Sequence, residues 1–126
     1  MSGRVVHFEI PFDDADRASA FYQEIFGWNL MPMPEMDYTG VSTGPTNEQG
    51  MPTEPGYIGG GMTPRGDMVP APVITVQVDD IDKTLATVEE RGGSRAGEKI
   101  QVADMGFAAY FRDTEGNLMG LWQNAG

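Results

Sequence analysis

The segment RVVHFEIPFDDADRASAFYQEIFGW (residues 4–28) has the pattern of a strand, a capped helix and a terminal glycine. A degenerate copy, PVITVQVDDIDKTLATVEERGGS, occupies residues 72–94. The two segments align without a gap, and the matched residues include Asp14 with Asp80, Ala20 with Ala86 and Gly27 with Gly93. Because one unbroken register runs through two strands and two helices, the sequence predicts an internal repeat of two similar modules.

The first strand of each module alternates between apolar and mixed positions, which is the pattern of a half-buried strand. In the first module the apolar face holds Val6, Phe8 and Ile10, and the other face holds Val5, His7 and Glu9. In the second module the apolar face holds Ile74, Val76 and Val78, and the other face holds Val73, Thr75 and Gln77. We therefore expect a helix to cover one face of each strand and a more polar environment to meet the other.

An amphipathic helix follows each of these strands. Asp13 or Asp14 is expected to cap the first helix, and Gly27 to end it. The apolar residues of this helix recur at helical spacing and predict a buried stripe of Ala18, Phe21, Tyr22, Ile25 and Phe26. The remaining strands are predicted near residues 28–31, 38–42, 57–63, 94–99, 106–112 and 117–123.

The predicted fold class is α+β, with two βαβββ modules in one domain. The domain covers residues 1–126, and its modules cover approximately residues 1–65 and 70–126. Each helix is expected to cover one face of a curved mixed sheet. The other sheet faces are too polar for a sealed core, so we expect them to meet as a cleft, the usual form of a ligand site.

The chain is strongly acidic: of its 126 residues, 8 are Lys or Arg and 19 are Asp or Glu, for a formal net charge of −11. This balance disfavours nucleic acid and anionic membranes as partners, because both attract basic patches. The sequence has no cysteine, which excludes disulfides and thiolate chemistry. No apolar run approaches the ~20 residues of a membrane helix and no signal peptide is visible, so we expect a cytoplasmic protein.

Four motifs carry a resemblance to a known family. They are HFEIPFDDADRASAFYQEIFGW, IGGGM, VDDIDKTLATVEERGG and YFRDTEGNLMGLWQ. As a set they resemble the vicinal oxygen chelate superfamily, which includes glyoxalase I, bleomycin-resistance proteins and extradiol dioxygenases. The resemblance extends over nearly the whole chain and implies the two-module fold. It implies no single activity, because the superfamily hosts many chemistries.

The resemblance also implies where a metal would bind, since metal-dependent members take ligands from the first and last strands of each module. In this sequence those positions fall on His7, Val73, Gly60 and Gly120. One imidazole does not make a working site, because even catalytic zinc keeps three protein ligands. We therefore predict no bound metal and no cofactor.

The candidate catalytic residues are His7 and Glu9. His7 could act as a general base, as a hydrogen-bond donor or as a structural histidine in the cleft wall. Thr75 and Gln77 are the matching ligand-binding candidates of the second module. Four aromatic residues could stack on a flat ligand or belong to the core or rim: Trp122, Tyr57, Tyr110 and Phe107. The glycines at 59–61 could bring the backbone close to a ligand or to a neighbouring strand.

The leading functional hypothesis is a metal-free protein that binds an unknown small molecule in the cleft between the modules, for sequestration, sensing or an unassigned reaction. One alternative is a metal-dependent lyase, isomerase or dioxygenase with displaced ligands. Another is a metal-independent enzyme that uses His7 and Glu9 as an acid–base pair. The resemblance further implies a homodimer. Nucleophilic catalysis has little support, because the chain has no cysteine, one histidine and no serine elbow motif.

Overall fold

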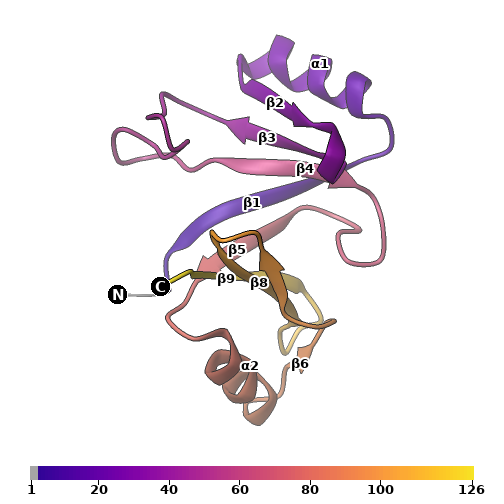
Figure 1. Ribbon diagram of the computed structural model, residues 1–126. Helices are drawn as coiled ribbons and strands as arrows, with labels where there is room; N and C mark the ends of the chain where they lie inside the picture. Colours follow the sequence, from indigo (N-terminus) through magenta and orange to yellow (C-terminus); the bar gives the residue numbers. More distant parts are fainter. Residues whose placement is uncertain (1–2) are drawn as a thin grey trace. The chain divides into compact units, whose positions relative to one another are not determined.

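The chain divides into two compact units in the computed structural model, which describes residues 3–126 (Figure 1). The N-terminal unit is His7–Pro72. The C-terminal unit is Val73–Gly126 together with the described residues before His7. The amide of Gly3 donates a hydrogen bond of 2.6 Å to the carbonyl of Gln77, which ties Gly3 to β5 of the C-terminal unit (Val73–Gln77).

The N-terminal unit has a helix on one side of a mixed sheet (Figure 1). Its elements in chain order are β1 (Val5–Phe12, which belongs to this unit from His7 onward), α1 (Ala15–Phe26), β2 (Asn29–Met33), the 3-10 helix η1 (Pro34–Met36), β3 (Tyr38–Ser42) and β4 (Gly60–Pro64). The strand order is β2-β3-β4-β1; β1 is parallel to β4, and the other neighbours are antiparallel. This is the predicted βαβββ module, and β3 has the predicted bounds.

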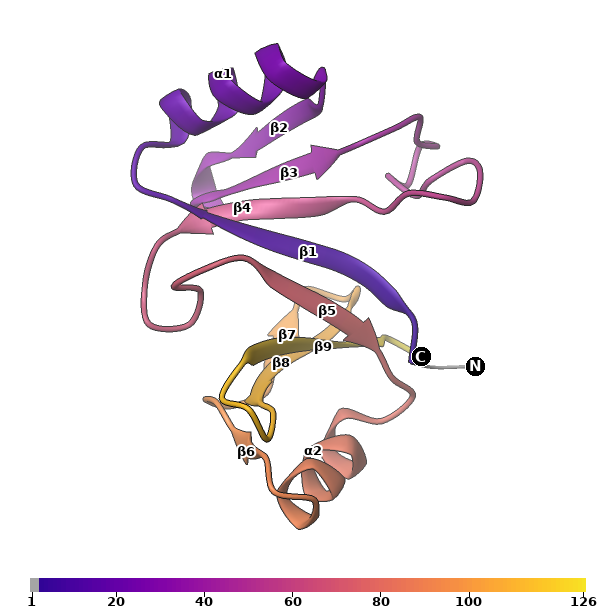
Figure 2. The same ribbon diagram turned by 180° about the vertical axis from the view of Figure 1, so that it is seen from behind.

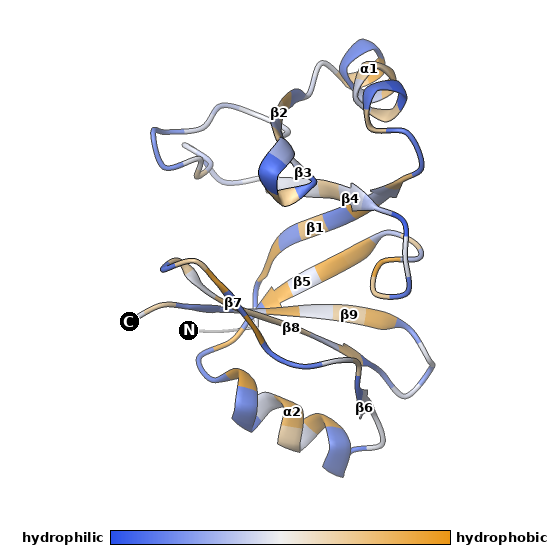
Figure 3. Cartoon of the chain, turned by 45° about the vertical axis from the view of Figure 1, so that its right-hand side comes forward, coloured by the Kyte–Doolittle hydropathy of each residue, from blue (hydrophilic) through white to orange (hydrophobic). Residues whose placement is uncertain are grey.

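The strand β1 alternates between hydrophobic and hydrophilic residues, as its colours in Figure 3 show. Phe8 and Ile10 pack against the buried cluster of this unit, which consists of Phe12, Val41 and Met62. Because successive side chains of a strand point to opposite faces, His7 and Glu9 lie on the face away from this cluster. The predicted division of these four residues between two faces is confirmed.

Local signals of the sequence set the limits of α1. Asp14 has an extended backbone, and its carboxylate accepts a hydrogen bond of 3.1 Å from the amide of Arg17. Gly27 has a φ of 72°, and its amide donates to the carbonyl of Gln23 at 2.9 Å. A left-handed residue that closes the last turn is a common helix end, and glycine adopts it without steric cost. Both predicted boundaries are confirmed, with Asp14 rather than Asp13 as the cap.

The apolar stripe of α1 is only partly buried. Ala18 and Tyr22 pack against the cluster of the N-terminal unit. Phe21, Ile25 and Phe26 are 55%, 53% and 61% exposed, so the prediction that all five residues are buried is wrong. The physical reason is that a helix lying on a sheet buries the side chains that point directly at it, while apolar residues on its flank stay in solvent.

The C-terminal unit repeats the module. Its elements are β5 (Val73–Gln77), α2 (Ile81–Glu90), β6 (Ser94–Arg95), β7 (Ile100–Val102), β8 (Gly106–Arg112) and β9 (Leu118–Asn124). The strand order is β5-β9-β8-β6, with β5 parallel to β9, and β7 also pairs with β8. The sequence predicted all of these strands except β7, whose three residues are too few to show a period.

The helix α2 lies along one face of its sheet, as seen from behind in Figure 2. Its buried cluster consists of Ile81, Leu85, Ala109 and Leu121. Asp80 caps the helix by accepting from the amide of Lys83 at 3.1 Å. The side chain of Gln123 accepts from the amide of Ile81 at 2.8 Å, so β9 also satisfies the helix start. No helix in the described part of the chain is long and apolar enough to cross a bilayer.

Met62 tests the assignment of the core. The substitution Met62→Ala should lower the free energy of unfolding by about 2–5 kcal/mol, because a fully buried side chain leaves a cavity. Met36→Ala is the matched control, since Met36 is 59% exposed in the same unit and its loss should cost less than about 0.5 kcal/mol. Urea titration measures both, and equal losses would contradict the assignment.

Candidate functional site

Three polar side chains gather on one face of the N-terminal sheet. His7 and Glu9 come from β1, and Tyr38 comes from the first position of β3. Nε2 of His7 lies 2.9 Å from the Tyr38 hydroxyl, and Tyr38 also hydrogen bonds to Glu9. All three side chains are half-buried. Tyr38 therefore links the two predicted catalytic candidates. The sequence predicted a strand at this position and no role for the tyrosine.

Tyr38 reaches this face because of a glycine in β4. In the sheet, Gly61 pairs with Glu9 on one side and with Gly40 on the other. A Cβ atom at Gly61 would collide with the ring and hydroxyl of Tyr38. The ring thus lies over the glycine and spans the distance between two non-adjacent strands. The glycines at 59–61 predicted a close approach to a ligand or to a neighbouring strand. In the structure, the group that approaches Gly61 is the side chain of Tyr38 in the same unit.

Burial is the main cause of the pKa shifts of His7 and Tyr38. It lowers the pKa of His7 from its ordinary value, and the negative charge of Glu9 partly opposes this shift. Burial, the charge of Glu9 and the hydrogen bond to Glu9 all raise the pKa of Tyr38 strongly. At neutral pH the imidazole and the phenol are therefore both uncharged.

The C-terminal unit places four of the predicted ligand-binding residues on one sheet face. Thr75 pairs with Gly120, which pairs in turn with Tyr110. Gln77 pairs with Trp122 one step further along the same strands. Directly paired residues share a face, and so do residues two apart in a strand. The four side chains therefore lie on the face opposite to α2.

The other two predicted aromatic residues have different surroundings. Phe107 packs against the buried cluster under α2, and the ammonium of Lys99 lies 5.0 Å from its ring centroid. Tyr57 donates a hydrogen bond of 2.6 Å to the carbonyl of Pro45, and its ring lies against Gly44. Phe107 thus lies beside the core, and Tyr57 lies in a loop. Neither residue is on the sheet face of His7 and Glu9 or on that of Thr75 and Gln77.

The described residues do not fit the metal that the family resemblance implies. A side chain at Gly60 would collide with Phe8, and one at Gly120 would meet the hydroxyl of Thr75 at 2.6 Å. At His7, Nε2 is already hydrogen bonded to a hydroxyl. Within residues 3–126 no group of three or more His, Asp or Glu side chains lies close enough to hold a metal ion.

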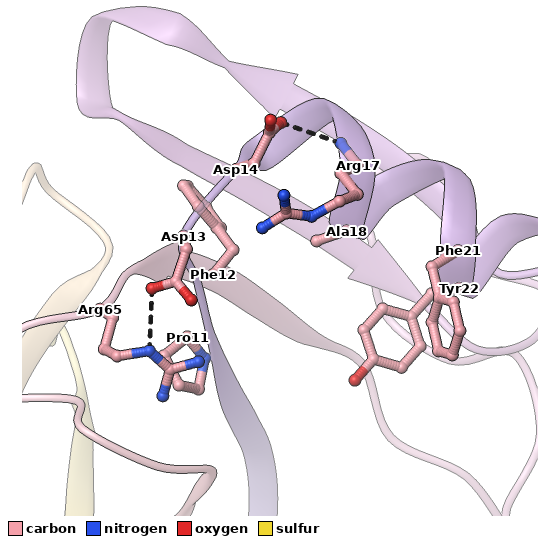
Figure 4. Close-up of a pocket in the computed structure, with 9 residues that line it drawn as sticks. All are labelled: Pro11, Phe12, Asp13, Asp14, Arg17, Ala18, Phe21, Tyr22 and Arg65. Carbon is pink, nitrogen blue, oxygen red and sulfur yellow. Dashed lines mark hydrogen bonds and ion pairs between the residues drawn. The ribbon is translucent and has the colours of Figure 1, made fainter.

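A separate hollow of about 290 Å³ lies at the start of α1 (Figure 4). Asp13 and Arg65 form an ion pair of 3.0 Å across it, and Asp14 is used as the helix cap. The rings of Phe21 and Tyr22 form part of its wall. Its volume is at the small end of the range for ligand pockets, and it contains none of the predicted site residues. It is therefore not the candidate site.

Comparisons with known proteins agree with this architecture. A family model described as bleomycin resistance protein-like N-terminal matches residues 4–44. A glyoxylase-like domain-containing protein of Didymella fabae is 27% identical over 131 residues, which cover 100% of this chain and 98% of that protein.

Solved structures with the same fold include two enzymes and one superfamily member. Methylmalonyl-CoA epimerase of Mycobacterium tuberculosis has a TM-score of 0.65 at 16% identity, covering 98% of this chain and 89% of that one. A variant of the Streptomyces coelicolor epimerase, in complex with 2-nitronate-propionyl-CoA, has a TM-score of 0.67 at 16% identity and covers 100% of both chains. A glyoxalase/bleomycin resistance protein/dioxygenase superfamily member from Vibrio splendidus has a TM-score of 0.61 at 15% identity, covering 97% and 98%.

Two βαβββ modules, each with its helix on one face of a mixed sheet, make up the vicinal oxygen chelate fold. In fold and sequence the chain is similar to proteins of the glyoxalase/bleomycin resistance protein/dioxygenase superfamily, and residues 4–44 match the bleomycin resistance protein-like N-terminal model. The predicted resemblance and fold class are confirmed.

The lowered pKa of His7 can be measured directly, because the chain has one histidine. An NMR titration of its imidazole should give a pKa below the ordinary 6.5. Glu9→Gln should lower this pKa further, since it removes the charge that raises it, whereas Glu35→Gln at an exposed position should not. A folded-state pKa below the unfolded one means that stability is lost as pH falls below about 6.5. A pKa above 6.5 would contradict the burial of His7.

Proposed function

We propose that this protein binds a small organic molecule, without a metal, on the sheet face that carries His7, Glu9 and Tyr38. The observation that supports the proposal is the hydrogen-bonded grouping of an imidazole, a carboxylate and a phenol on one half-buried face. Ionisable groups are costly to withdraw from water unless partners are supplied. Because the three side chains are only half-buried, a ligand can replace the water that meets them. Binding of this kind serves sequestration or sensing.

Acid–base catalysis is the second candidate function. The observation that favours it is the position of the Tyr38 hydroxyl, which bonds to both His7 and Glu9 and so connects a base to a carboxylate. Such a connection lets a proton move between the two groups while a substrate reacts at His7. Mass spectrometry of a bound ligand before and after incubation separates this function from binding alone, because only catalysis changes the ligand.

The binding proposal is tested with two neighbouring substitutions on opposite faces of β1. A thermal-shift screen of metabolite fractions should find one that stabilises the wild-type protein, by about 2.7 kcal/mol at a ligand concentration roughly 100 times Kd. His7→Ala should abolish this stabilisation and leave the protein folded. Phe8→Ala removes an aromatic ring of the helix-facing side, so it should cost about 3 kcal/mol of stability and retain the response to the ligand.

The reverse pattern would overturn the proposal. If His7→Ala keeps the thermal shift, or if it destabilises the protein as much as Phe8→Ala does, then the polar face of β1 is not the binding site.

We also propose that the chain assembles as a homodimer, as the family resemblance suggests. The apolar flank of α1, defined by Phe21, Ile25 and Phe26, supports this, because covering exposed apolar area is favourable at roughly 25 cal/mol per Å². Light scattering at micromolar concentration should give the mass of two chains, and Phe21→Glu should give a monomer. Met51→Glu places the same charge at another exposed apolar residue and should leave the dimer intact. A monomeric wild-type protein would contradict the proposal.

A further inference from the structure

We infer that Tyr38 fixes the tautomer of His7, so that the site takes an uncharged or cationic ligand that donates a hydrogen bond to Nδ1. The inference rests on the proposed binding function and names the chemical class of its ligand. Its basis is the hydrogen-bond inventory of three side chains and the distribution of charge in the N-terminal unit.

The hydrogen-bond inventory starts with the phenol, which has one proton to donate. Tyr38 bonds to both Glu9 and His7. A charged carboxylate can only accept, so the phenol proton is given to Glu9. The phenol oxygen then accepts from His7, and the hydrogen of that 2.9 Å bond belongs to Nε2.

The second ring nitrogen follows from the first. A neutral imidazole carries one N–H, so an Nε2–H tautomer has a lone pair on Nδ1. This nitrogen accepts hydrogen bonds and cannot donate them. A ligand group that meets it must therefore offer an N–H or O–H, as amides, amines, amidines and alcohols do, and a bare carboxylate or phosphate does not.

The distribution of charge in the N-terminal unit also disfavours an anionic ligand. The basic residues of His7–Pro72 are Arg17 and Arg65, and both line the hollow at the start of α1. Arg65 is also paired with Asp13. Both arginines of this fully described segment thus lie at the hollow, and the charged group that the unit places on the polar face of β1 is the carboxylate of Glu9, which is hydrogen bonded to Tyr38. An anionic ligand would meet a like charge there, while a cationic one would gain from it.

Gly61 leaves the space that the Tyr38 ring needs to reach His7. Because the Tyr38 ring occupies the space over Gly61, any side chain at this position displaces the ring from His7. The same unit contains a second pair of this kind, in which the Tyr57 ring lies 2.7 Å from the Cβ position of Gly44 and its hydroxyl bonds to Pro45. The second pair provides a matched control for substitutions of the first.

The first arm of the experiment is NMR of the single histidine and needs no ligand. In ¹⁵N-labelled protein above the imidazole pKa, Nε2 should be the protonated nitrogen, and its proton should exchange slowly with water. Tyr38→Phe and Gly61→Ala should each speed this exchange on the order of tenfold, the factor expected for loss of one hydrogen bond. Tyr57→Phe and Gly44→Ala should leave it unchanged.

The second arm compares three fragments that share a benzene ring: benzamidine, benzamide and benzoate. At millimolar concentration, benzamidine and benzamide should shift the Nδ1 resonance of His7, and benzoate should not.

Three results would overturn the inference: protonation at Nδ1 in the wild-type protein, unchanged exchange in Tyr38→Phe, or a response to benzoate and not to the two donors. If none of the three fragments shifts the Nδ1 resonance of His7, the assigned ligand class is also overturned. These failures differ from failure of the binding proposal, which is judged by whether His7→Ala loses the response to the screened metabolite fraction.

Discussion

The period of two along β1 is the constraint on which both the core and the candidate site depend. A strand has two faces, so the same eight residues must serve two environments. Phe8 and Ile10 complete the buried cluster under α1. His7 and Glu9 are held at fixed spacing on the other face by that packing. A shift of one residue would move each pair to the wrong face, so the stability of the unit preserves the geometry of the site.

Glycine in β4 is the second determinant of the site. Because Gly61 has no side chain, the ring of Tyr38 crosses over β4 and brings its hydroxyl to residues of β1. The hydroxyl is hydrogen bonded to Nε2 of His7. The N-terminal module thus has the βαβββ architecture, while its polar face is organised by a tyrosine hydrogen bond.

The two modules share their fold but differ in the chemistry of their polar faces. The N-terminal face carries ionisable groups, whereas the C-terminal face carries a hydroxyl, an amide and aromatic rings from Thr75, Gln77, Tyr110 and Trp122. Trp122 is oriented by a 2.7 Å hydrogen bond from its indole N–H to Asn124. The internal repeat therefore keeps what a module needs to fold, namely caps and apolar faces, and leaves the opposite face free to differ.

The sequence by itself determined the modules, the caps of α1 and the two faces of β1, because these follow from short-range spacing and local hydrogen bonding. It also identified His7 and Glu9 as the polar pair on one strand face. Only the tertiary structure revealed that Tyr38 joins them, since that contact spans 31 positions and depends on strand register and on the space over Gly61. The same holds for Phe107, whose packing under α2 is set by which face of β8 meets the helix. Side chains far apart in sequence meet only where the sheet pairs their strands, and local patterns do not encode that pairing.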